Sequence, residues 1–246
     1  MQQLKNYTYA FDNPIKFIDA DGREPIDPAK EAFYRTFAMP LINNLANRSG
    51  ANKFKALYLV AQKRQESGMR LQYHGNIFNM KGVGDAGYDE YPAREVDKNG
   101  HSYMEMAKYA KYLRTDKAVD AYFDLMNNGN KGYAKAYDAL TNGKTIDDFV
   151  QGLKEGGYAT DPKYSTAIKK IFRGVVSDFK EMLTSDKEAN DKEIGQIQSE
   201  TKAVTDKLGS GILSEIYQTI QSSRINAIQK KNDGINNDLN LLNQLK

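Results

Sequence analysis

The last quarter of the chain carries mostly apolar residues spaced alternately three and four positions apart, and this spacing strongly constrains the fold. Before residue 209 the spaced residues are Ile194, Ile197, Thr201, Val204 and Leu208. Such a pattern predicts a helix with a seam of the coiled-coil kind. Gly209-Ser210-Gly211 interrupts it, and a second amphipathic run continues to residue 245. We therefore expect an antiparallel helical hairpin over 185–246, serving in docking rather than chemistry.

Residues 28–184 have the helical patterns and loop signals of a globular domain. One helix is expected over 28–49, broken or kinked at Pro40 because a proline ring does not fit inside a regular helix. The next helix is expected over 52–68. Its apolar residues fall on a single face, which should be its buried face: Phe54, Leu57, Val60 and Ala61.

Further helices are expected after a short β or irregular, glycine-rich insertion. A long helix is predicted over 102–126, because Ser102 and Glu105 have the spacing of a capping box. Two shorter helices are predicted over 145–155 and 161–183. The fold class that follows is mainly α.

Composition excludes several kinds of chemistry. The chain has no cysteine, which rules out disulfides and thiolate metal sites, and its two histidines lie in no metal or triad motif. The net charge of +3 is too small to indicate nucleic acid. No apolar run has the 18 or so residues of a membrane span. We expect no cofactor, no metal, no nucleic acid and no membrane span. The N-terminus lacks an apolar h-region, so no signal peptide is predicted.

Glu66 lies at the C-terminal end of the helix predicted over 52–68, a place that suits a general acid. Cleavage of a glycosidic bond needs a protonated carboxyl group beside the leaving oxygen, and therefore a raised pKa. The negative end of the helix dipole opposes a carboxylate charge, and apolar packing disfavours that charge too. Taken alone, the same setting fits an ordinary solvated glutamate.

Three blocks resemble the signatures of bacterial glucosaminidases of the flagellar-rod hydrolase and autolysin type. Residues 61–68, AQKRQESG, are similar to the family's Ala-Gln-x-x-x-Glu-Ser-Gly. Residues 76–82, NIFNMKG, are similar to its Asn-Leu-Phe-Gly-Ile-Lys stretch, and residues 157–164 to its Gly-Tyr-Ala-Thr-Asp-Pro-x-Tyr motif. The blocks occur in the family's order, and the resemblance covers about residues 36–175.

The resemblance implies a lysozyme-like fold with a groove between lobes. It also implies an N-acetylglucosaminidase that cuts the GlcNAc-MurNAc backbone of peptidoglycan. Glu66 maps to the catalytic acid, and Tyr158 to a tyrosine that lines the groove near it. Asn76 and Phe78 map to the block that forms the groove floor. The alternative for Tyr158 is a buried core position, and the alternative for Asn76 and Phe78 is a structural role.

The chain departs from the family pattern beside the acid. Met69-Arg70 stands where the family usually has Trp-Gly, and the chain contains no tryptophan. Stacking against sugar rings would then fall to tyrosines, of which Tyr73, Tyr88 and Tyr91 are the local candidates.

The second carboxylate is less well defined. The family often carries it on a β-hairpin lobe, and the interval between Lys81 and Ser102 is short. Glu90 followed by Tyr91 resembles the Glu-Tyr of that hairpin, so Glu90 or Asp89 is favoured as the base that activates water. If neither serves, the N-acetyl group of the substrate would assist departure.

Residues 1–27 resemble the end of the core of Rhs/YD-repeat proteins. The matching residues are Tyr7, Tyr9, Asn13, Pro14, Phe17, Asp19, Asp21 and Gly22. Ala20 replaces the usual proline, and Asp12 the usual first asparagine. In that family a variable toxin follows this motif. A disordered leader is one alternative, and a calcium loop is another, although too few ligand positions follow at the required spacing.

The three segments, 1–27, 28–184 and 185–246, together predict the C-terminal toxin of an Rhs effector. Such a toxin would be secreted as cargo, for example by type VI secretion, and would act in the periplasm of a target bacterium. Its expected partners are peptidoglycan, the remainder of the Rhs shell and a cognate immunity protein that plugs the groove at Glu66. The alternatives are a muramidase or lytic transglycosylase of the same fold, a non-catalytic wall-binding module, and a housekeeping autolysin.

Overall fold

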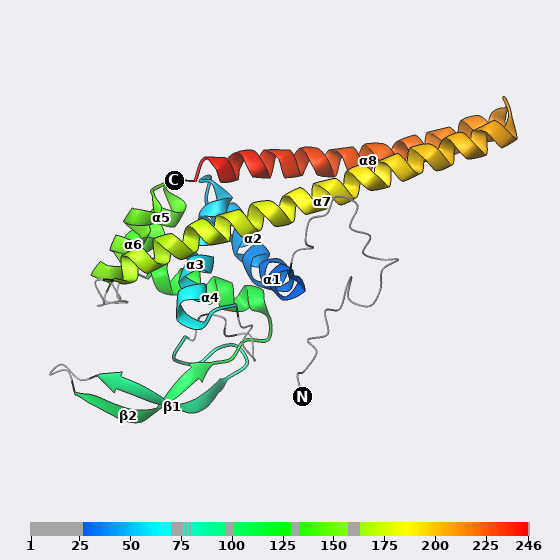
Figure 1. Ribbon diagram of the computed structural model, residues 1–246. Coiled ribbons are helices and arrows are strands. Elements are labelled where there is room, and N and C mark those ends of the chain that lie inside the picture. Colours follow the sequence, from blue (N-terminus) through cyan, green and yellow to red (C-terminus); the bar gives the residue numbers. More distant parts are fainter. Residues whose placement is uncertain are drawn as a thin grey trace, which may run out of the picture.

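A body of short helices carries one small β-hairpin, and two long helices leave the body side by side (Figure 1). The computed structural model describes residues 27–69, 76, 78, 80–96, 101–128, 133–156 and 163–245. Over these residues the fold is mainly α, as the sequence predicts. The N-terminal segment with the Rhs-like motif lies outside the described residues.

The first helical stretch continues through Pro40 by widening one turn. It consists of α1 (Pro28–Phe33), a π-helical turn (Tyr34–Ala38) and α2 (Met39–Arg48). The amide of Met39 donates to the carbonyl of Tyr34, five residues earlier, just before the proline. A π turn relieves the clash between a proline ring and the preceding turn, so the break or kink expected at Pro40 takes the form of a local π bulge.

Helix α3 (Leu57–Ser67) runs through the centre of the body, entered by a 3-10 turn over Lys53–Ala56. Residues 54–63 are all buried, including the polar side chains of Lys55, Gln62 and Lys63. The prediction of a single buried face is therefore wrong. The helix is enclosed because α2, the π turn and α7 (Tyr164–Leu208) pack around it.

The long helix predicted over 102–126 is wrong in its first part. Residues Ser102–Ala110 form strand β2, which pairs antiparallel with β1 (Tyr88–Val96), and α4 begins only at Thr115 and ends at Asn127. The nine-residue ladder satisfies the backbone groups of both strands and outweighs the helix propensity of Met, Glu, Ala and Lys. The supposed capping residue Ser102 is instead paired with Val96.

Helices α5 (Ala134–Thr141) and α6 (Ile146–Glu155) pack closely on one another. Helix α6 occupies the range expected for it, and its Thr145–Asp148 capping box fixes its start. The sequence did not predict α5. Gly152 allows the close packing, because a Cβ atom there would lie 2.3 Å from the amide nitrogen of Ala136.

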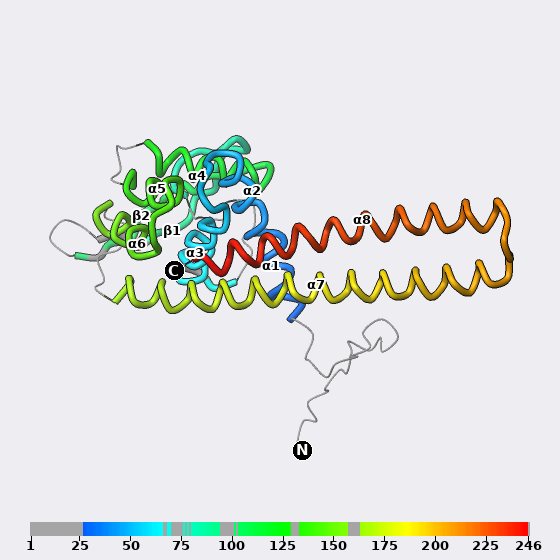
Figure 2. The backbone as a smooth tube through the Cα atoms, turned by 90° about the horizontal axis from the view of Figure 1, so that it is seen from above, coloured from blue at the N-terminus to red at the C-terminus, as the bar shows by residue number. Residues whose placement is uncertain are grey.

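The helical hairpin predicted for the C-terminal segment is confirmed. Helix α7 does not end near residue 183 but continues to Leu208, so the predicted boundary at 184/185 lies within it. After Gly209, whose φ is +67°, α8 (Ile212–Asn243) runs back beside α7 to the body, in both views (Figures 1 and 2). There the Asn52 side chain donates to the carbonyl of Leu241 at 2.8 Å.

The seam between α7 and α8 is partly polar. Asn232 accepts from Asn190 at 2.8 Å and donates to Asp191 at 2.6 Å. The first large apolar residues of α8 are exposed and not buried against α7: Ile212, Leu213, Ile216 and Ile220. Of the described helices, none is both long and apolar enough for a membrane crossing.

Candidate active site

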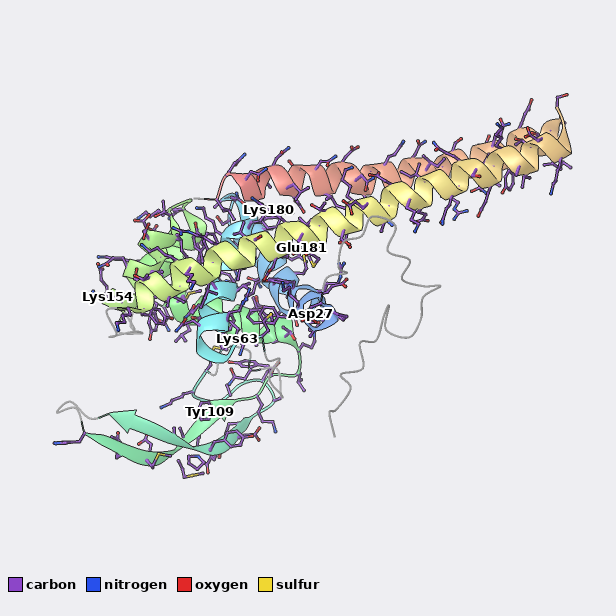
Figure 3. The ribbon with its side chains drawn as sticks, in the orientation of Figure 1. Asp27, Lys63, Tyr109, Lys154, Lys180 and Glu181 are labelled. Carbon is purple, nitrogen blue, oxygen red and sulfur yellow. The ribbon has the colours of Figure 1, made fainter. Side chains whose placement is uncertain are left out.

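Glu66 occupies the last turn of α3, as the sequence predicts. The helix ends at Ser67, and Gly68 reverses the chain with a φ of +64° while its amide donates to the carbonyl of Arg64. In Figures 1 and 3, α3 runs through the body toward the hairpin, with Lys63 in its lower part and Tyr109 on the hairpin below it. The C-terminal end of α3, where Glu66 lies, therefore points toward the hairpin in this view, while the Glu66 side chain lies outside the described part.

A half-buried ion cluster holds this end of α3 in place. Arg64, two residues before Glu66, donates to the Asp178 carboxylate and to the Tyr34 hydroxyl, both at 2.9 Å. Tyr34 donates to the same carboxylate at 2.8 Å, and Lys30 to its other oxygen at 2.9 Å. The Asp178 carboxylate, on α7, therefore joins α1, α3 and the π turn between α1 and α2.

The cluster shifts the pKa values of Asp178 and Tyr34. Burial works to raise the pKa of Asp178, but hydrogen bonds from Lys30, Tyr34 and Arg64 outweigh it, so that pKa lies below its ordinary value. Burial raises the pKa of Tyr34 far above its ordinary value, and the Asp178 carboxylate raises it further. Both pKa shifts favour an ionised Asp178 carboxylate and a neutral Tyr34 phenol, which are the forms that these hydrogen bonds require.

Asn76, predicted for the groove floor, is engaged with the backbone. It is buried, and its side-chain amide donates to the carbonyl of Met80 at 3.0 Å while its oxygen accepts from the amide of Met80 at 2.8 Å. The carbonyl of Met80 also accepts from Ala110 of β2. Asn76 thus anchors the chain where it enters the hairpin.

Phe78, the second predicted floor residue, stacks on Tyr122 of α4 with ring centroids 3.7 Å apart and planes 11° apart. Its ring also contacts that of Phe37, with the ring centroids 5.9 Å apart. The hydroxyl of Tyr122 donates to Oε1 of Gln62 at 3.0 Å, so this aromatic pair reaches α3 one turn before Glu66. Sequence reasoning did not single out Tyr122 or Gln62 for the site, although Gln62 belongs to the motif around Glu66.

The hairpin is fastened at its base by close backbone contacts. Gly82 donates to the carbonyl of Lys108, which continues the pairing made by Met80. Gly84 lies so near the residue that follows β2 that a Cβ atom there would be 2.0 Å from the carbonyl oxygen of Lys111. A side chain at position 84 would force the strands apart, so the glycine sets how the hairpin leaves the body.

The two candidate bases lie on opposite faces of this hairpin. Asp89 is paired with Tyr109 and Glu90 with Lys108, and successive strand residues point to opposite sides. Asp89 forms an ion pair with Lys111 at 3.1 Å. Glu90 is exposed, and no hydrogen bond or ion pair joins it to another residue in the described part of the chain.

Tyr91, a candidate for sugar stacking, is 51% exposed and lies on the Asp89 face, where its ring is 6.0 Å from that of Tyr109. Tyr88 lies on the Glu90 face, with the Lys108 ammonium 4.3 Å from its ring centre. The other two candidates, Tyr73 and Tyr158, lie outside the described residues. No group of three metal-binding side chains occurs in the described ranges.

The mainly helical body, the β-hairpin and the family match over the same region together place this chain in one class of protein, the glycoside hydrolases. The particular family follows from the sequence of the same region. The model of the glucosaminidase family, described as mannosyl-glycoprotein endo-beta-N-acetylglucosaminidase, matches residues 40–175. This match covers more than half of the chain, which therefore belongs to the glucosaminidase family.

Two curated relatives and one solved structure agree with this assignment. Peptidoglycan hydrolase FlgJ of Pseudomonas aeruginosa is 30% identical over 144 residues, which are 55% of this chain and 34% of that protein. FlgJ of Vibrio cholerae is 27% identical over 97 residues, 39% of this chain and 28% of that protein. The chain thus spans about a third of the length of these relatives or less.

Among solved structures, the catalytic domain of the autolysin Auto from Listeria monocytogenes aligns with a TM-score of 0.51. The alignment covers 71% of this chain and 97% of that domain, at 18% sequence identity. At this identity the likeness shows the fold alone, and it supports the lysozyme-like body and hairpin described above.

Proposed function

We propose that this chain hydrolyses the glycan backbone of peptidoglycan, with Glu66 as the general acid. The observation that carries the proposal is the position of Glu66 in the last turn of an enclosed helix, at the end that points toward the hairpin in Figure 1. The Arg64–Asp178 contact holds that turn in place, as a positioned acid requires. The curated relatives, which are named as peptidoglycan hydrolases, supply the substrate class.

In this mechanism the Glu66 carboxyl group gives its proton to the glycosidic oxygen as the bond from that oxygen to the sugar carbon breaks. The sugar carbon develops positive charge, and a water molecule adds to it. A second carboxylate takes the proton that this water loses. Before the next turnover, the second carboxylate releases this proton to solvent and Glu66 takes one up, so that both groups return to their starting forms.

We assign the second carboxylate to Glu90 rather than Asp89. The Lys111 ammonium holds the Asp89 carboxylate, and breaking this pair would oppose its use as a base. Glu90 carries no such contact in the described part of the chain, and the strand register places it on the other face. Tyr88 and Lys108 lie on the same face beside it, with the Lys108 ammonium 4.3 Å from the centre of the Tyr88 ring.

Replacing Glu90 with glutamine should lower kcat for glycan hydrolysis by about 100-fold, the usual contribution of a general base. Asp89→Asn, its matched control, should lower kcat by less than about 10-fold, because it disturbs only the Lys111 contact. Initial rates on purified peptidoglycan would measure both. A larger loss of kcat in Asp89→Asn than in the Glu90 variant would assign the base to Asp89. Small effects of both changes would point to assistance by the N-acetyl group of the substrate.

The bond that is cut is proposed to be the one on the reducing side of GlcNAc, which makes the chain an N-acetylglucosaminidase. Digestion of purified peptidoglycan with the wild-type chain, followed by mass spectrometry, tests this. Products with a reducing-end GlcNAc are expected. Anhydro-muramic products would show a lytic transglycosylase, and a reducing-end MurNAc a muramidase.

We further propose that the enzyme acts as an antibacterial toxin, the terminal part of an Rhs effector delivered to the periplasm of a target cell. The order of motifs at residues 1–27, together with the wall-degrading family of the following domain, supports this role. Expression directed to the periplasm of a test bacterium should lyse it, and the product of a neighbouring gene should prevent lysis. If the enzyme is active on purified peptidoglycan but does no harm when expressed in the periplasm, the toxin role would be contradicted.

A further inference from the structure

Gln62 has an unusual hydrogen-bonding state for a buried amide. Its side chain is 1% exposed, and its Oε1 accepts the hydroxyl of Tyr122 at 3.0 Å. Its Nε2 is buried with no hydrogen-bond acceptor within reach in the described part of the chain. Buried polar atoms in native proteins are nearly always paired, and an unpaired one calls for an explanation, such as a role in catalysis.

The aromatic contacts of Tyr122 fix the orientation of the Gln62 amide. The Tyr122 ring stacks on Phe78 at 3.7 Å, and Phe78 contacts Phe37 in turn. These contacts prevent the tyrosine hydroxyl from swinging away from α3. Because Tyr122 donates to Oε1, the Nε2 hydrogens of Gln62 must point elsewhere.

Two residues of α3 lie on the same helical face as Gln62, one turn to either side. The earlier one, Tyr58, has its hydroxyl within 3.3 Å of both the Lys55 ammonium and the carbonyl of Lys144. The later one is Glu66, the last acidic residue before the helix ends. A glutamine amide and a carboxyl group four residues apart can meet on a helix surface.

We propose that Gln62 is a positioning residue for Glu66, to which its Nε2 donates a hydrogen bond during the reaction; this rests on the proposed function. A bond to one carboxyl oxygen leaves the acidic proton on the other, from which it can pass to the glycosidic oxygen. As that proton leaves, Glu66 becomes a carboxylate, and the bond from Nε2 becomes charge-assisted and stronger. Gln62 therefore stabilises the transition state more than the bound substrate.

The expected signature is a loss of kcat without a loss of substrate binding. Gln62→Met keeps the size of the side chain and removes the donor, and should lower kcat by about 10- to 100-fold with KM changed by less than about 2-fold. Tyr58→Phe, on the same helix, removes a buried hydroxyl whose partners are Lys55 and the carbonyl of Lys144, and should leave both constants near wild type. Tyr122→Phe frees the Gln62 amide to rotate and should lower kcat by about 3- to 10-fold.

The test is a double-mutant comparison on purified peptidoglycan, with circular dichroism as the check on folding. Adding Gln62→Met to Glu66→Gln should cause no further loss, because the two residues act as a unit. Equal losses of kcat in the wild-type and Glu66→Gln backgrounds would overturn the proposal, as would a wild-type kcat in Gln62→Met. If Gln62→Met does not fold, a wild-type kcat in Tyr122→Phe would overturn it.

These outcomes separate the inference from the proposed function. A wild-type chain without activity on glycan strands, or an active Glu66→Gln variant, would contradict the proposed function itself. An active wild type, an inactive Glu66→Gln and a fully active Gln62→Met would contradict only the role of Gln62.

Discussion

Glu66→Gln is expected to abolish hydrolysis of peptidoglycan, lowering kcat by at least about 1,000-fold, within the range for loss of a general acid. The amide is nearly isosteric with the carboxyl group but has no proton to give to the glycosidic oxygen. The protein should stay folded, because Arg64 and Gly68 hold the last turn of α3 without using the Glu66 side chain. Release of soluble glycan fragments, read by mass spectrometry, is the measurement.

The control for this variant is Glu181→Gln, which changes an exposed glutamate on α7 far along the chain from the site (Figure 3). Its activity should equal that of the wild type. Glu66→Gln should still sediment with insoluble peptidoglycan, since binding does not depend on the proton. Wild-type lysis by Glu66→Gln would instead support a non-catalytic wall-binding module.

Asp178→Ala is expected to lower the free energy of unfolding by about 2–3 kcal/mol. The substitution leaves Lys30 and Arg64 as partly buried cations without their shared carboxylate, and the Tyr34 hydroxyl without its acceptor. Urea unfolding at neutral pH, followed by circular dichroism, would measure the change. Asp186→Ala, on the same helix, breaks only the exposed pair with Arg35 and should cost less than about 1 kcal/mol. Equal effects of the two variants would contradict the importance of the cluster.

The contribution of Asp178 should disappear in acid. Because its pKa in the folded protein lies below the value of an unfolded chain, the folded state binds fewer protons in that range, and the stabilisation is complete above roughly pH 4. It is lost as the pH falls through the folded pKa. The stability difference between wild type and Asp178→Asn should therefore be largest near neutral pH and shrink below about pH 4. A difference that grew on acidification would contradict this assignment.

Helix ends and the C-terminal hairpin were predictable because their causes are local. Gly68 and Gly209 adopt positive φ values that end α3 and α7, and each is visible in the sequence as a break in the apolar pattern. The 3-4 spacing before Leu208 and the apolar run after Ile212 predicted two helices joined by a turn. Such signals depend on a few neighbouring residues and not on the rest of the fold.

Strand β2 shows where local signals were insufficient. Residues 102–110 consist largely of good helix formers, Met104 and Met106 among them, and Ser102 and Glu105 have the spacing of a capping box. Both methionines are in fact exposed on the hairpin, 63% and 60%. The pair Asn99-Gly100, a common hairpin turn signal, was present in the sequence and pointed to the correct structure. Pairing with β1, whose partner residues lie from 6 (Val96 and Ser102) to 22 (Tyr88 and Ala110) positions away along the chain, outweighed the helix preference.

The sequence alone was sufficient to place Glu66 at the end of a helix and to indicate the family, because the motif and the glycine that ends the helix are contiguous. Only the tertiary structure shows how that helix end is held. The Asp178 carboxylate meets Arg64 from more than a hundred residues away, and the Tyr122 hydroxyl meets Gln62 across two helices. The strand register likewise decides that Asp89 and Glu90 face opposite sides. Contacts between distant segments follow from how the helices pack as a whole, which local propensity does not encode.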